Sequence, residues 1–136
     1  MDQKLRIKHY LTSLLSDKLS DFHLINGGKQ RTVGDLVENK ISEIILSSTN
    51  ELISETKEAR SKKSIEDVSI VSEGCVYYID PKTHDINSTF SMPNLTSISK
   101  IKEIINDDNK EVIYIFVSYS VEDQNIRIKD IKISFI

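Results

Sequence analysis

Apolar residues in this chain recur with two different periods, which separate helical segments from strand segments. Where they return every three or four positions, the pattern predicts amphipathic helices, at residues 3–20 and 33–54. Where valine, isoleucine and tyrosine are dense or alternate with polar residues, it predicts strands, at residues 68–71, 75–82, 111–121 and 126–136. A third helix is predicted at residues 94–105, with Asn94 as its cap. The polar, charged residues 56–64 are expected to form a loop or an exposed helical end, and residues 83–93 a polar loop.

The resulting order, α-α-β-β-α-β-β, predicts an α/β fold with a mixed central β-sheet flanked by helices. Glu73-Gly74 leaves only a short turn between the first two strands, so these should pair as an antiparallel hairpin. A break in the alternation near Asp130 predicts a bulge in the last strand. With 136 residues, we expect a single domain, 1–136. Because the sequence stops inside an apolar strand, we expect a fragment that is truncated at its C-terminus.

Composition places the chain among ordinary globular proteins, with 38% apolar and 29% charged residues. No apolar run approaches the roughly 18 residues that a membrane span needs. The charged N-terminus has no apolar signal core, and Cys75, the only cysteine, excludes an internal disulfide and a cysteine-rich zinc site. We therefore expect a cytoplasmic protein with no membrane partner.

The net charge of −3 argues mildly against DNA binding, because phosphate contacts need local lysine and arginine. Basic residues nevertheless gather in two groups, which are either solvated surface or a DNA-facing side. The groups are Lys57, Arg60, Lys62 and Lys63, and then Lys100, Lys102, Arg127, Lys129 and Lys132.

Two acids and one lysine stand at the ends of the predicted hairpin. Asp67 begins its first strand, and Asp80 and Lys82 end its second, two residues apart and therefore on one face. Two carboxylates can hold Mg²⁺, and a lysine can position water or stabilise charge on a phosphate. This set is what phosphodiester hydrolysis requires. The alternative is a surface ion pair at strand ends.

Three motifs in register resemble a known family. They are Asp67-Val-Ser-Ile-Val, then Tyr78-Ile-Asp80-Pro-Lys82-Thr83-His84, then Met92-Pro93-Asn94-Leu95. Together they resemble type II restriction endonucleases of the PD-(D/E)xK superfamily, of the HincII and EcoRV kind. The resemblance covers residues 66–105 well and 33–55 more loosely. One departure is Pro81, where the family usually has a β-branched residue. Proline suits an edge strand or a bulge and not a central strand, so it could tilt Lys82 out of place.

The resemblance implies a site-specific endonuclease that cuts double-stranded DNA with Mg²⁺ as cofactor, acting as a homodimer. It implies that Asp67 and Asp80 ligate the ion and that Lys82 is the catalytic lysine. A glutamate from the preceding helix joins them, with Glu38 the better match and Glu43 the alternative.

For DNA contacts the resemblance suggests Ser91, Asn94 and His84. Asn94 has the competing role of a helix cap, and His84 that of a structural residue. Two alternative functions stay open. One is an inactive or truncated relative that keeps the fold, and the other is a small α/β interaction module.

Overall fold

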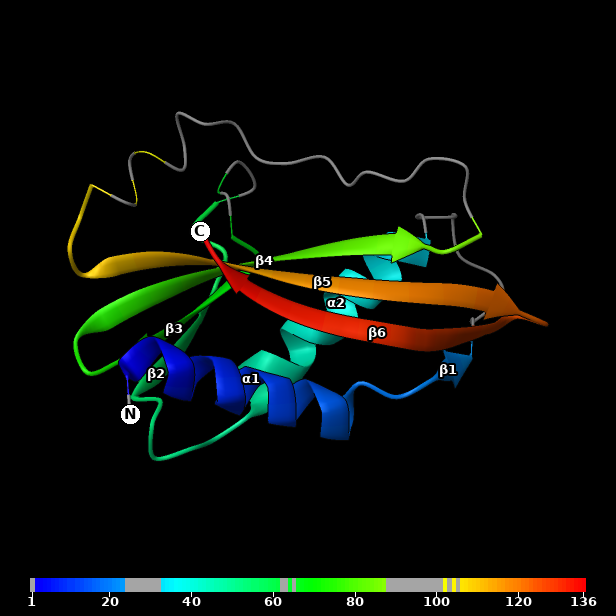
Figure 1. Ribbon diagram of the computed structural model, residues 1–136, viewed down its shortest axis with the longest axis horizontal. Helices are drawn as coiled ribbons and strands as arrows, with labels where there is room; N and C mark the ends of the chain where they lie inside the picture. Colours follow the sequence, from blue (N-terminus) through cyan, green and yellow to red (C-terminus); the bar gives the residue numbers. More distant parts are fainter. Residues whose placement is uncertain are drawn as a thin grey trace.

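A computed structural model of the chain describes residues 2–23, 33–61, 64, 66–87, 102, 104 and 106–136 (Figure 1). Two helices and six strands follow one another along these residues. They are α1 (Gln3–Lys18), β1 (Phe22–His23), α2 (Val33–Ser47), β2 (Glu55–Glu58), β3 (Val68–Ser72), β4 (Cys75–Asp85), β5 (Lys110–Glu122) and β6 (Asn125–Phe135).

The six strands form one mixed sheet in the order β1-β6-β5-β4-β3-β2. β4 and β5 run parallel over their whole shared length, and every other neighbouring pair is antiparallel. The predicted mixed sheet is thereby confirmed, as is the hairpin of β3 and β4. Its turn places Glu73 and Gly74 at φ of 50° and 78°, a left-handed conformation that glycine adopts without steric cost.

The predicted bulge in the last strand is also confirmed. Ser118 pairs with Asp130, but the next residue of β5, Tyr119, pairs with Ile128. Lys129 is therefore the extra residue, one position from the break in alternation that predicted it.

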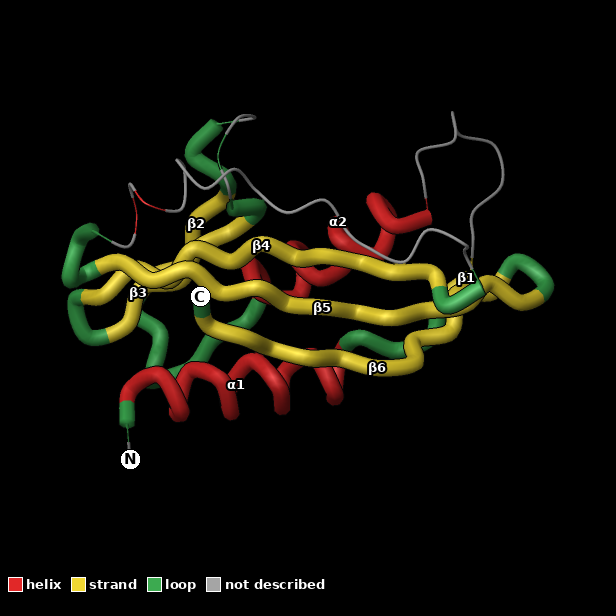
Figure 2. Tube along the Cα trace, turned by 45° about the horizontal axis from the view of Figure 1, so that its top comes forward, coloured by secondary structure: helices red, strands yellow, loops and turns green. Residues whose placement is uncertain are grey.

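Both described helices pack on one face of the sheet (Figure 2). Their buried residues recur at helical spacing and meet the odd-numbered side chains of β4 and β5; they are Ile7, Leu11, Leu15, Val37, Ile41 and Ile45. None of the described helical residues forms a helix long and apolar enough to cross a membrane. Most of the predicted helix 94–105 lies outside the described residues. Lys102 and Ile104 of it are helical, and Ile104 packs on the other face, against Tyr78 and Val112.

Several predicted boundaries were wrong. α2 ends at Ser47 and not at residue 54. The hydroxyls of Ser47 and Ser48 donate to carbonyls of its last turn. Leu52 and Ile53 pack against the core from a turn held by Asn50.

The polar stretch predicted as a loop or helical end contains an edge strand, β2, and residues 83–85 continue β4 instead of starting a loop. β2 is polar and largely exposed, so it carries no hydrophobic alternation that could have revealed it. The two-residue β1 was missed for its shortness.

Pro81 lies in an interior strand of the sheet, where proline is unusual, and Lys82 still pairs with Asp80 on the same strand. The local pairing explains how the sheet accommodates the proline. Backbone N–H groups point alternately to the two neighbours of a strand, and that of Val76 donates toward the β5 side, to the carbonyl of Asn109. The nitrogen of Pro81 therefore faces the β3 side, where pairing stops at Val68 opposite Ile79. The proline removes no hydrogen bond from the β3–β4 ladder.

Candidate active site

Asp80 and Lys82 form a nearly buried ion pair on β4. The Lys82 Nζ lies 3.2 Å from the Asp80 Oδ2, and the two side chains are 17% and 6% exposed. Their spacing of two residues places both on the face of Tyr78, away from the helix layer, as the sequence predicted. In the register with β5, Asp80 lies beside Tyr114 and Lys82 beside Phe116, so aromatic side chains line this pair on one side.

Asp67 lies directly before β3, where the hairpin brings it next to the end of β4. Its backbone N–H donates to the Ile79 carbonyl at 3.0 Å, one residue from Asp80. Burial raises the pKa of Asp67, and the charge of Asp80 raises it further, while Lys82 opposes both. The two aspartates and the lysine are thus close enough to influence one another, as expected from the hairpin.

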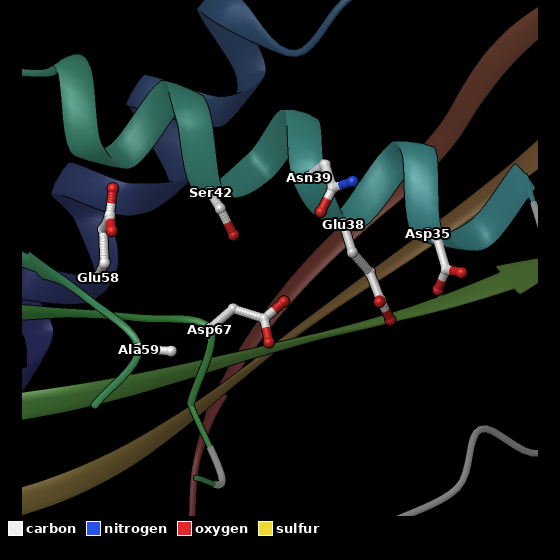
Figure 3. A pocket seen from close by; sticks show the side chains of 7 residues that line it. All are labelled: Asp35, Glu38, Asn39, Ser42, Glu58, Ala59 and Asp67. Atoms are coloured by element: carbon white, nitrogen blue, oxygen red, sulfur yellow. The ribbon is translucent and has the colours of Figure 1, made fainter. Parts of the chain in front are cut away.

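Glu38 approaches Asp67 from α2. In Figure 3 its carboxylate extends from the helix toward β4, and the carboxylate of Asp67 points toward it. The two line one pocket of about 470 Å³, together with Asp35, Asn39, Ser42, Glu58 and Ala59. Burial, followed by the charges of Asp67 and Asp35, raises the pKa of Glu38 to about 7. Glu43, the alternative, is exposed and does not line this pocket.

Glu66, the neighbour of Asp67, has a different environment. Its side chain is fully buried and binds the Arg60 guanidinium, with Nε at 2.8 Å. The neighbouring acids Glu66 and Asp67 therefore have different surroundings. Asp67 faces the acids of α2, and Glu66 points into the interior and pairs with Arg60, whose side chain is half exposed.

Asp35 is the acid that sequence reasoning overlooked. It stands one helical turn before Glu38, in the first turn of α2, and its charge raises the pKa values of both Glu38 and Asp67. The three-residue spacing to Glu38 was the available signal, because residues at i and i+3 share a helix face.

The predicted DNA-contacting residues are only partly placed. Ser91 and Asn94 lie outside the described residues. His84 is half-buried on β4, two residues beyond Lys82 and so on the same face. Its role stays a prediction.

The donor chemistry of this site fits Mg²⁺. The site gathers carboxylates, which are hard oxygen ligands, beside a lysine that only partly offsets their charges. Within the described part of the chain, no three His, Cys, Asp or Glu side chains already stand at metal-binding spacing. Mg²⁺ does not require such a cage, because it is commonly bound by one or two carboxylates, with water and substrate phosphate supplying the rest.

No protein-family model matches this chain, and no curated protein matches it in sequence. Among solved structures it is similar to the NlaIV restriction endonuclease, with a TM-score of 0.59 and 16% identity. The match covers 97% of this chain and 56% of that chain. At this identity the likeness shows the fold: the chain has a restriction endonuclease-like fold and spans a little over half the length of that neighbour.

Proposed function

We propose that this chain is a Mg²⁺-dependent endonuclease of the PD-(D/E)xK superfamily that hydrolyses phosphodiester bonds in double-stranded DNA. One observation carries the proposal: Asp67 lies between two groups of charged side chains. Its backbone is bonded to β4 next to the Asp80–Lys82 ion pair, and its side chain lines one pocket with Glu38 of α2. The restriction endonuclease-like fold supports the proposal.

Asp67 and Asp80 are the proposed ligands of the ion, with Glu38 beside them. When bound, Mg²⁺ would neutralise phosphate charge and lower the pKa of a coordinated water. Lys82 is held against Asp80, where its ammonium group can donate a hydrogen bond to an oxygen of the scissile phosphate. It would stabilise the negative charge that grows on that group while water adds to phosphorus and the bond to the leaving oxygen breaks.

A comparison of matched variants tests the proposal. Purified protein is incubated with supercoiled plasmid and Mg²⁺, beside Asp80→Ala, Lys82→Ala and Glu43→Ala. We expect nicked and linear plasmid from the wild type, and a rate lower by on the order of 10²–10³-fold for the first two variants. Glu43→Ala removes an exposed acid of the same helix and should cleave at the wild-type rate. Cleavage that survives both site variants, or that is absent from the wild type, contradicts the proposal.

Site specificity, as in the type II enzymes of the HincII and EcoRV kind, belongs to the same proposal, as do a homodimer on palindromic DNA and a cytoplasmic location. Two-fold symmetric proteins match two-fold symmetric sites. Sequencing the fragment ends from a plasmid of known sequence tests specificity. One recurring sequence at the ends is the expected result, and random ends would restrict the proposal to a non-specific nuclease.

A further inference from the structure

Arg60 and Glu66 close the connection between β2 and β3 immediately before Asp67. The two Glu66 carboxylate oxygens accept hydrogen bonds from Arg60, one from Nε at 2.8 Å and one from a terminal guanidinium nitrogen at 3.0 Å. The backbone N–H of Arg60 adds a third, at 3.4 Å. The Glu66 side chain is 0% exposed, so a two-pronged charged contact fixes this end of the connection in the interior.

The same arginine also contacts β4. Its guanidinium carbon lies 4.4 Å from the ring centroid of Tyr78, which is 6% exposed. Tyr78 precedes Asp80 by two residues and shares its face of the strand. Arg60 therefore joins the β2–β3 connection to the part of β4 that carries the acid and the lysine of the proposed site.

These contacts hold the backbone of Asp67 on both sides. Glu66 is anchored to Arg60, and the Asp67 N–H is bonded to the carbonyl of Ile79. With its neighbour directed into the interior, Asp67 directs its carboxylate toward Glu38 (Figure 3). Because Glu66 is paired with Arg60 in the interior, Asp67 is the acid of the two that faces Glu38.

We infer that the Arg60–Glu66 pair is a positioning device that fixes the place of Asp67 next to the part of β4 that carries Asp80. This inference rests on the proposed function. Ion sites need their ligands held within about 0.5 Å, and Asp67 lies just outside the regular strand, so contacts other than the strand pairing must fix its backbone. An ion pair that takes a carboxylate out of water is a weak source of stability, since apolar replacements often do as well, and the Arg60 partner is half exposed. A geometric role therefore explains the pair better than stability does.

Two other roles for Arg60 make different predictions. If Arg60 contacted a DNA phosphate, removing it would weaken DNA binding and lower its salt dependence, while ion affinity stayed the same. If the pair only stabilised the fold, its loss would lower the melting temperature and leave the ion affinity of the folded protein unchanged.

The test measures Ca²⁺ affinity by calorimetry, well below the melting temperature of each variant, in the absence of DNA. Arg60→Ala breaks the pair, Glu66→Gln keeps its size but loses its charge, and Arg60→Lys keeps the charge without the two-pronged geometry. We expect the dissociation constant to rise about 10-fold for the first two and less for Arg60→Lys, as for other residues that orient metal ligands. Ile7→Val, a mild core change in α1, controls for stability and should bind Ca²⁺ like the wild type.

A parallel measurement with Asp67→Asn distinguishes failure of the positioning role from failure of the proposed ion site. If Asp67→Asn loses Ca²⁺ binding while Arg60→Ala and Glu66→Gln keep it, the positioning role is wrong and the ion site stands. If Asp67→Asn binds Ca²⁺ as tightly as the wild type, the proposed site itself is wrong. Reduced affinity in all three, with Ile7→Val unchanged, supports both.

Discussion

Carboxylates at two places on the sheet differ in how far hydrogen bonds and positive charges of the protein stabilise their negative charge. At the outer edge, Asp21 accepts the N–H of Ile128 at 2.9 Å and an Arg127 nitrogen at 3.1 Å. The backbone hydrogen bond, followed by the arginine, lowers the pKa of Asp21. At the junction of α2, β3 and β4, burial and neighbouring acids raise the pKa values of Glu38 and Asp67. The first environment favours the charged carboxylate, and the second opposes it.

The difference separates an acid whose charge the chain compensates from acids whose charges it compensates only in part. Asp21 attaches the segment of β1 to β6, and its charge is compensated within the chain. The acids at the α2–β3–β4 junction gain no comparable compensation, since Lys82 only partly offsets their repulsion. Groups with strongly shifted pKa values gather at functional sites because function requires such unfavourable arrangements. A bound cation would supply the positive charge that Lys82 does not fully provide.

The largest expected effect concerns the response to Mg²⁺. At a free ion concentration of 100 times its dissociation constant, binding should stabilise the wild type by about 2.7 kcal/mol. Asp67→Asn removes a proposed ligand, and a 100-fold loss of affinity would reduce this gain to about 0.4 kcal/mol. Chemical denaturation with and without Mg²⁺ measures both.

Asp21→Asn is the matched control for that experiment, because it makes the same chemical change in the compensated environment. It should keep the full stabilisation by Mg²⁺. Equal responses in the two variants would contradict the distinction between the environments.

A smaller effect concerns pH in the absence of divalent ions. The pKa of Glu38 is about 7 in the folded protein, against an ordinary value of 4.5. Between these values the folded state holds a proton that the unfolded chain releases, so stability falls as pH rises. Glu38→Gln abolishes this contribution. The unfolding free energy of Glu38→Gln minus that of the wild type should rise by about 1–2 kcal/mol between pH 4.5 and 8. This is below the roughly 3 kcal/mol that the whole pKa shift of Glu38 corresponds to, because solvent screens a partly exposed group.

Denaturant unfolding at several pH values in a chelator provides the measurement, and Glu43→Gln is the control on the same helix. Mg²⁺ should weaken the pH dependence of the wild type, because the ion favours the charged carboxylate. A difference between Glu38→Gln and the wild type that stays constant with pH would show that Glu38 does not carry an elevated pKa.

The strongest predictions from the sequence were those that rest on backbone period. Alternation fixes that Asp80 and Lys82 share a face, and the short Glu73-Gly74 turn brings Asp67 beside them, so this part of the site followed from local rules. The side chains that α2 contributes depend on how the helix is rotated against the sheet. For this reason Glu38 and Glu43 were hard to separate, and Asp35 was overlooked.

A strand without alternating hydrophobic residues could not be predicted from the sequence either. β2 is polar because it is an exposed edge, and its hydrogen bonds to β3, not its composition, make it a strand. Pro81, in contrast, carries a sequence signal that is misleading about the sheet. Proline avoids interior strands because it cannot donate a backbone hydrogen bond to a neighbouring strand. Here β3 ends before it lies opposite Pro81, so no donor is needed, and the sequence does not show where β3 ends.

The smallest expected effect concerns Asp21 itself. Its pKa is lowered in the folded state, so its stabilising contribution is present above the ordinary value of 3.8 and is lost as pH falls through the folded value. Because Asp21 and Arg127 are each about half exposed, the contribution is small and screened by salt. Asp21→Asn should lower the melting temperature by no more than about 3 °C at neutral pH and low salt, less in high salt, and less again as pH falls through the folded-state pKa of Asp21. Thermal unfolding across pH and salt measures this. A larger decrease that persists in high salt would mean that the backbone hydrogen bond to Ile128, and not the ion pair, makes Asp21 important to this edge of the sheet.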